Sequence, residues 1–136
     1  MVTMKNLKAL NIILWIAQII LAGMFIMAGF MKSITPIEQL SASLPWTKDV
    51  PVGLVRFIGI SEFLGALGLI LPSLLRIKPI LTPVAALGII AIMVMAAFFH
   101  ITRAEFSGVA FTLMLALVAA FIGWGRWKKV PIQEKS

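Results

Sequence analysis

Residues 52–71 of the chain read VGLVRFIGISEFLGALGLIL, a run that is apolar apart from Arg56, Ser61 and Glu62. A helix needs about 20 such residues to cross the hydrocarbon core of a bilayer, so this run is long enough for one crossing. Three further apolar runs occupy residues 10–31, 80–99 and 106–124. The sequence therefore predicts an all-α protein that crosses a membrane four times as a helical bundle.

The amino-acid composition also places the chain in a lipid environment. Of its 136 residues, 61% are hydrophobic and 12% are charged, whereas about a quarter of the residues in a soluble domain are charged. The surplus of apolar surface is expected to face lipid, and the four runs leave no room for a soluble domain. We expect residues 1–136 to form a single transmembrane domain in contact with the lipid bilayer.

Several classes of chemistry are excluded by residues that are missing or rare. The sequence has no cysteine and one histidine, so it offers no disulfide framework, no thiol chemistry and no zinc or iron–sulfur site. The net charge of +7 is distributed between the apolar runs, rather than along one basic face with interleaved aromatic residues. We therefore expect no metal and no nucleic-acid partner.

The residues between the runs indicate where the helices begin and end. Pro72 is expected to end the second helix, and Thr82 with Pro83 resembles an N-cap followed by a first-turn proline. Ser107 is a candidate cap for the fourth helix, and Gly125 is expected to end it. The first run follows two lysines, as in a signal peptide, but it is too long and lacks an A-x-A-like cleavage site. We expect this first segment to be retained.

The one long connection, residues 33–51, carries signals for a short helix. Thr35, Pro36 and Glu38 fit a capping box with proline at the first helical position. Apolar residues then follow at helical spacing on one side, and Trp46 is typical of a residue anchored at the membrane interface. We interpret residues 36–44 as a short interfacial helix, with a plain surface loop as the alternative.

The positions of lysine and arginine predict the orientation. Eight of these residues lie on the side that holds both termini and the second connection, and four lie on the opposite side. Because positive charge accumulates on the cytoplasmic side of a membrane protein, we expect the N and C termini to be cytoplasmic. The long connection is then external or periplasmic.

Glu62 is the clearest candidate for a functional residue, because a charged side chain inside a bilayer costs at least about 2.5–3.5 kcal/mol. It shares a helix face with Gly59, Gly65 and Ala66, and small residues beside a carboxylate allow another helix to approach closely. The Glu62 side chain is therefore expected to point into the bundle. Arg56 lies about 120° away around the same helix, so a cation from another helix is the better partner.

Two other helices supply polar residues that belong with Glu62. In the first helix Gln18, Phe25 and Lys32 lie on one stripe, and the third helix ends at His100. Lys32 or His100 is the expected partner of Glu62, and Glu62 and His100 are the candidate catalytic groups for proton transfer. We hypothesise a polar cavity in the outer half of the bundle, lined by Gln18, Phe25, Lys32, Arg56, Glu62 and His100. Alternatively, Glu62 only fixes the fold through an interhelical hydrogen bond or ion pair.

The chain resembles the DoxX-like family of small bacterial membrane proteins over about residues 10–125. The resemblance is carried by Trp15, Gln18, Phe25, Gly29 and Lys32 in the first helix, by Arg56, Gly59 and Glu62 in the second, and by Thr82, Pro83 and His100 in the third. It implies a multi-pass protein with four transmembrane helices in a bacterial inner membrane. Relatives include subunits of redox enzymes and assembly chaperones of ion channels, so the resemblance assigns no single activity.

Three functions remain open, and no self-contained catalytic motif decides whether the protein is an enzyme. The first is a redox accessory subunit that interacts with a quinone or a small anion, and a quinone is the cofactor considered. The second is a non-enzymatic assembly or partner protein that packs on another membrane protein, such as a redox enzyme, or on a second copy. The faces expected for that contact are Gly59/Ala66 and Ala22/Gly29. The third is a small-solute or proton transporter, which a four-helix chain without an internal repeat disfavours.

Overall fold

The computed structural model describes residues 3–135 and confirms an all-helical chain, with four helices in this part that are long and apolar enough to cross a membrane. A short helix lies between the first and second of them, as expected. The elements in chain order are α1 (Met4–Ile34), α2 (Ile37–Ser43), the 3₁₀ helix η1 (Pro45–Asp49), α3 (Val52–Leu75), α4 (Leu81–Thr102), α5 (Phe106–Trp124) and the π-helical turn η2 (Gly125–Lys129).

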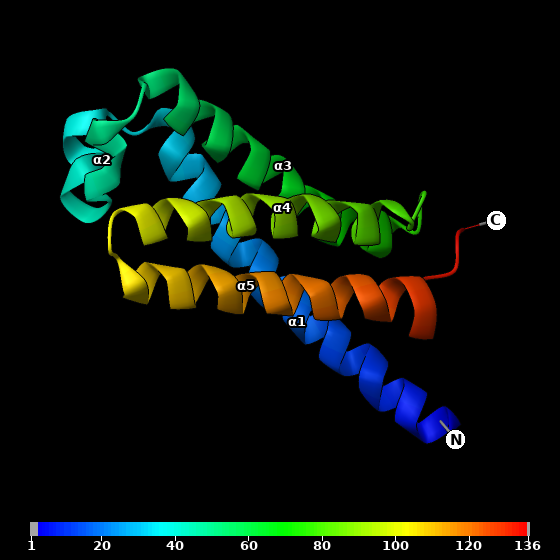
Figure 1. The fold of residues 1–136 in the computed structure, drawn as a ribbon. Helices are drawn as coiled ribbons and strands as arrows, with labels where there is room; N and C mark the ends of the chain where they lie inside the picture. The colour runs from blue at the N-terminus through cyan, green and yellow to red at the C-terminus, as the bar shows by residue number, and fades with distance from the viewer. Residues whose placement is uncertain (1–2, 136) are drawn as a thin grey trace.

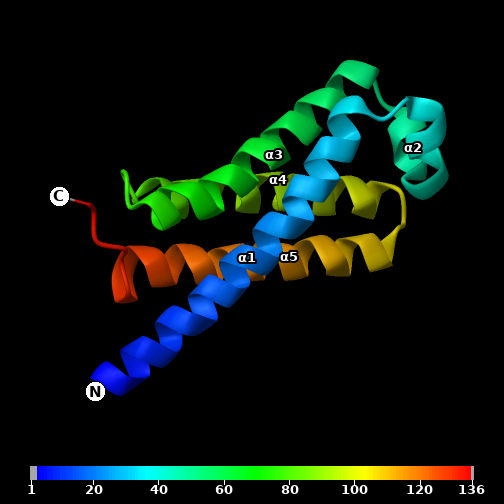
Figure 2. The same ribbon diagram turned by 180° about the vertical axis from the view of Figure 1, so that it is seen from behind.

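The bundle is assembled from two helix pairs. Helix α1 packs along α3, α4 packs along α5 as an antiparallel hairpin, and α3 packs against α4 to join the pairs (Figure 1). Helix α1 crosses α5 obliquely, and its N-terminal part extends beyond the bundle (Figure 2). Both termini and the α3–α4 turn lie at one end, called here the terminal end. The segment α2–η1 and the α4–α5 connection lie at the opposite end, called the loop end.

The spans differ in length from the apolar runs that predicted them. Helix α1 covers 31 residues instead of 22 and is about 46 Å long at 1.5 Å per residue. This length exceeds the hydrocarbon thickness of about 30 Å, in agreement with its oblique path. Thr3 caps its N-terminus by accepting a hydrogen bond from the Asn6 backbone N–H at 3.2 Å. Helix α4 is shifted to Leu81–Thr102, whereas the range 106–124 is confirmed for α5.

The prediction that Pro72 ends the second span is wrong, because α3 continues beyond it and stops at Arg76, whose φ is 58°. A proline inside a helix leaves the carbonyl four residues earlier without its N–H donor, and this carbonyl belongs to Gly68. Thr82 Oγ1 donates to the Gly68 carbonyl oxygen at 3.1 Å and also lies 2.7 Å from Ser73 Oγ. A hydroxyl from α4 thus replaces the missing donor, and α3 passes through its proline.

The predicted caps are wrong in three places. Thr82 and Pro83 lie inside α4, and the Thr82 hydroxyl donates a hydrogen bond to a carbonyl of α3. Thr35 closes the C-terminus of α1 by donating its N–H to a carbonyl of that helix, so the capping box does not form and Pro36 occupies the N-cap of α2. Ser107 lies inside α5. At Thr82 the error arises because the hydroxyl bonds to the neighbouring helix instead of to its own helix end.

The core of the bundle is apolar and contains Leu21 and Phe25 of α1, Leu69 of α3, Ile89 of α4 and Ile122 of α5. The outer faces of the four long helices are apolar too, with many large exposed hydrophobic side chains. Transmembrane helices present such faces to hydrocarbon because their backbone polar groups are satisfied internally. The four spans therefore place the protein in contact with the lipid bilayer.

Candidate functional site

Glu62 points into the bundle and forms an ion pair with Lys32. Lys32 Nζ of α1 donates to Glu62 Oε1 of α3 at 2.7 Å. The Glu62 side chain is 2% exposed and that of Lys32 is 13% exposed. Of the two partners that the sequence proposed for Glu62, the structure places Lys32 on its carboxylate. The pair joins the loop-end half of α1 to α3.

Two glycines bring the helices close enough for this pair to form. A Cβ on Gly29 would lie 2.6 Å from the Gly59 carbonyl oxygen, and a Cβ on Gly59 would lie 2.7 Å from Lys32 Cβ. Gly29 and Gly59 are therefore used inside the molecule, at the contact between α1 and α3. Ala22 and Ala66 are also buried. The expectation that these faces receive a partner protein is wrong, because α1 and α3 cover each other with them.

Arg56 lies on a different side of α3 and does not pair with Glu62, in agreement with its angular position. Its Nη1 donates to the carbonyl oxygens of Lys32 at 2.9 Å and Thr35 at 2.7 Å. These carbonyls belong to the C-terminal end of α1, where backbone oxygens lack intrahelical donors. Arg56 thus caps α1 from the neighbouring helix.

An aromatic cluster connects this region to α4. Trp46 of η1 lies with its ring 5.9 Å from Lys32 Nζ and 5.8 Å from the Phe99 ring, in an edge-on arrangement. The Phe99 ring in turn lies 6.2 Å from the His100 ring. Thr47, next to Trp46, is buried. Segment α2–η1 therefore packs between the two helix pairs at the loop end, in addition to the membrane-interface position expected from the sequence. We call Lys32, Trp46, Phe99 and His100 the loop-end cluster.

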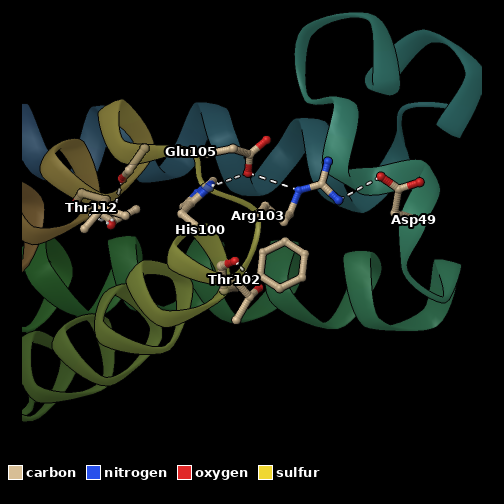
Figure 3. Close-up of polar contacts among 9 residues, drawn as sticks. Asp49, His100, Thr102, Arg103, Glu105 and Thr112 are labelled. Atoms are coloured by element: carbon tan, nitrogen blue, oxygen red, sulfur yellow. Dashed lines mark hydrogen bonds and ion pairs between the residues drawn. The ribbon is translucent and has the colours of Figure 1, made fainter.

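His100 pairs with Glu105, so the structure does not place it on Glu62 (Figure 3). His100 Nδ1 donates to Glu105 Oε1 at 3.0 Å, and Arg103 Nε donates to the same oxygen at 3.1 Å. Arg103 Nη1 continues the chain to Asp49 Oδ2 of η1 at 2.8 Å. The hydrogen bond from His100, followed by that from Arg103, holds the pKa of Glu105 below its ordinary value. A Cβ on Gly108 would meet the His100 ring, so that glycine makes room for the imidazole.

Gln18 and Phe25 complete the list of predicted site residues, and neither contacts the loop-end cluster in the structure. Phe25 is buried in the apolar core. Gln18 donates through Nε2 to the Leu69 carbonyl oxygen at 2.7 Å and accepts from Arg126 Nε at 2.7 Å. The polar stripe of α1 is therefore divided, with Lys32 at the loop end and Gln18 bonded to the terminal end.

Sequence reasoning missed Arg126, which it treated only as a charge beyond the end of the fourth helix. Helix α5 ends at Trp124 with Gly125 as its C-cap, as predicted, but the chain then continues through the π-helical turn η2, in which Arg126 is buried. Arg126 is 3% exposed and its Nη1 donates to Asn11 Oδ1 at 2.7 Å and to the Val130 carbonyl oxygen at 3.0 Å. The guanidinium also lies 5.3 Å from the Trp15 ring. The signal that could have found it is Gln18, a buried amide that requires partners.

Two grooves lie away from the loop-end cluster. One, of about 510 Å³, opens at the terminal end between α1, the end of α3 and the chain after η2. The other, of about 460 Å³, lies between α3 and α4 and is lined by small and aliphatic residues. Neither groove is lined by any of the six residues proposed for the cavity. Within residues 3–135, no group of three His, Cys, Asp or Glu residues could hold a metal ion.

Comparison with known proteins identifies the family of the chain. The family model described as the DoxX-like family matches residues 16–122, which include the ion pair and most of the four spans. No curated protein and no solved structure matches the chain. The small multi-pass membrane protein described here belongs to the DoxX-like family.

Proposed function

We propose that this protein is a non-enzymatic accessory subunit that packs against a second membrane protein. The observation that carries the proposal is the closed Lys32–Glu62 pair, in which the strongest candidate for a reactive group is already neutralised within the chain. His100, Arg56 and Gln18 are likewise engaged by other parts of the molecule. Groups that fix helices to each other in this way support a scaffold role more directly than a catalytic one.

The groove between α3 and α4 is the surface that this proposal assigns to the partner. It contains Gly65, Gly68 and Gly88 with Ser61 at its side, and a Cβ at Gly88 would meet nothing within 4 Å. Small residues allow a transmembrane helix to approach closely, and a serine can hydrogen-bond across the contact. The occupant that fits this surface is an apolar helix of another membrane protein.

The proposed location is a bacterial inner membrane, with the terminal end on the cytoplasmic side. Eight of the twelve lysine and arginine residues lie toward the terminal end, against four toward the loop end. This distribution supports the orientation through the tendency of positive charge to stay in the cytoplasm. Labelling of single cysteines introduced at Lys48 and Lys128 with a membrane-impermeant reagent tests it: in intact cells only the Lys48 position should react.

Site-specific cross-linking tests the accessory role. A photo-cross-linking amino acid at Gly88 lies in the groove, and the same residue at Met95 on α4, which is 71% exposed, faces lipid outside it. In native membranes we expect one discrete protein adduct from position 88 and only lipid adducts from position 95. Lipid adducts alone from both positions would remove the partner proposal, and an adduct with a second copy would replace the partner with a homo-oligomer.

The loop-end cluster favours one second candidate, a redox accessory subunit that contacts a quinone or a small anion there. The rings of Trp46 and Phe99 lie beside an ammonium and an imidazole, and such groups are able to stack on a quinone ring and donate to its carbonyl oxygens. Glu62 and His100 would then move protons. Binding of a short-chain ubiquinone that is lost in Trp46→Ala but retained in Trp127→Ala supports this candidate. Absence of binding to several quinones removes it.

A further inference from the structure

Helix α1 and the end of α3 form two sides of the terminal-end groove, and each side contributes both apolar and cationic side chains. Leu7 of α1 and Leu74 of α3 contribute apolar surface, whereas Lys8 and Arg76 contribute cationic groups. The third side is formed by residues 130–133, which follow η2 and run toward the end of α3 (Figures 1 and 2). A groove of this kind at the end of a transmembrane bundle lies where the lipid headgroups begin.

Hydrogen bonds hold the tail in place as a wall of the groove. Arg76 Nε donates to the Gln133 carbonyl oxygen at 2.8 Å, and the Lys135 backbone N–H donates to the Arg76 carbonyl oxygen at 2.8 Å. The Val130 N–H donates to the Gly125 carbonyl oxygen at 2.7 Å. The groove is therefore a constructed feature, closed by residues that are far from α1 and α3 in sequence.

A buried cation without an anion lies directly behind this groove. Arg126 bonds to Asn11 and Val130 and lies against the Trp15 ring, and all three of these residues line the groove. Every hydrogen-bond acceptor of Arg126 is neutral, and its Nη2 has no partner among residues 3–135. Burial of an unneutralised charge with a free donor is costly. An anion in the adjoining groove would offset part of this cost.

The surroundings of the groove supply further positive charge and almost no negative charge. The cations at this end are Lys5, Lys8, Arg76, Lys78, Arg126, Lys128, Lys129 and Lys135, and the one acid here is Glu134. None of these cations takes part in an ion pair within the described residues. At the loop end, by contrast, Lys32 and Arg103 are paired with carboxylates. The unneutralised charge is therefore concentrated at one end of the molecule.

We propose that the terminal-end groove binds one anionic phospholipid, with its phosphate between Lys8 and Arg76, next to the buried Arg126 charge, and with its acyl chains on the apolar side chains that line the groove. Basic pockets at the ends of transmembrane helices recognise anionic headgroups by this combination of charge and apolar contact. A free phosphate ion would satisfy the cations but would leave Leu7 and Leu74 uncovered. The bound lipid brings a negative charge close to Arg126 and links α1, α3 and the tail.

Native mass spectrometry of the full chain in a neutral detergent tests the proposal, with phosphatidylglycerol and phosphatidylcholine as probes. We expect one phosphatidylglycerol to be retained per chain, in preference to phosphatidylcholine, and the lipid to raise the melting temperature. Lys8→Gln should weaken retention about fivefold, the effect of one lysine near an anionic lipid. Lys5→Gln removes the same charge from the same helix outside the groove and should change retention less than twofold.

Three results would overturn the proposal. Equal retention of the two lipids would show that the site does not recognise charge, and equal effects of Lys5→Gln and Lys8→Gln would reduce it to general attraction at the surface. If millimolar inorganic phosphate raised the melting temperature as much as phosphatidylglycerol does, the ligand would be a soluble anion. Arg126→Gln should abolish the preference for phosphatidylglycerol, and the two lysine variants decide the question if this variant does not fold.

Discussion

Replacement of Lys32 by methionine is expected to destabilise the bundle by about 3–5 kcal/mol, because it leaves the Glu62 carboxylate buried and without its cation. The Glu62 side chain is 2% exposed, so neither water nor a headgroup can take the place of the ammonium. Glu62→Leu leaves the cation instead, but the Lys32 side chain is 13% exposed and can extend outward. We expect this second variant to lower the free energy of unfolding by less, about 1–3 kcal/mol.

The double variant Lys32→Met with Glu62→Leu separates the value of the pair from the cost of an orphaned charge. Replacement of a buried ion pair by apolar residues of similar volume is often neutral, so we expect the double variant to lie within about 1 kcal/mol of the natural chain. The coupling energy is then about 3 kcal/mol or more, well above that of independent sites. If the pair has only a structural role, the double variant should still form the protein adduct from the cross-linking amino acid at Gly88.

Reversible unfolding in mixed micelles of a mild detergent and dodecyl sulfate measures these free energies, with helical circular dichroism as the signal. Lys48→Met is the matched control, because Lys48 is exposed in η1 and has no carboxylate partner among residues 3–135; it should change stability by less than about 0.5 kcal/mol. The reasoning is refuted if Lys32→Met lies within about 1 kcal/mol of the natural chain. It is also refuted if the double variant is as unstable as Lys32→Met alone.

Three further outcomes are expected. Gly29→Ala should lower the free energy of unfolding by about 1–3 kcal/mol, because the new methyl group meets the backbone of α3 at 2.6 Å. Gly23→Ala, in open space on the same helix, should be neutral or stabilising by up to about 1 kcal/mol. The same unfolding assay compares the two variants. Arg56→Gln should cost about 1.5–3 kcal/mol, since two carbonyls of α1 lose a charged donor, and faster amide exchange should be confined to the C-terminal turn of α1. The pKa of Glu105 is lowered from its ordinary 4.5 by the hydrogen bond from His100, so its contribution to stability is present above about pH 4.5 and is lost as the pH falls through the lower folded-state pKa. Melting temperatures of the natural chain should therefore decline below pH 4.5 more steeply than those of Glu105→Gln, and parallel curves would contradict this.

The spans and the inward position of Glu62 could be predicted from sequence because both depend on local pattern. A run of 20 apolar residues has few alternatives to a membrane helix, and Gly59, one turn from Glu62, marks the face on which α1 approaches. Lys32 was one of two partners that the sequence offered for Glu62, and the structure decides between Lys32 and His100. These predictions required only helical periodicity and the cost of a charge in lipid.

The features that sequence could not supply are contacts between distant residues. The path of α3 through Pro72 depends on a hydroxyl of Thr82, which local rules assign to a helix cap. Gln18 and Arg126 are 108 positions apart and meet only because η2 turns the chain inward. The predicted six-residue cavity combined a stripe of the first helix with residues placed by membrane depth, and the structure divides them between the loop end, the core and the terminal end. Depth in the bilayer is readable from sequence, whereas the packing partner is not.

Lys32 precedes Glu62 in the sequence and therefore reaches the membrane first during biosynthesis. Segment α3 carries Arg56 and Glu62, and each charge at the centre of a span raises the cost of insertion by several kcal/mol. Because α1 is already present with its glycine face and its ammonium, α3 enters beside a ready counter-charge instead of bare hydrocarbon. Insertion of α3 is thereby coupled to α1, so a nascent chain that lacks the first helix should expose Glu62 to membrane quality control.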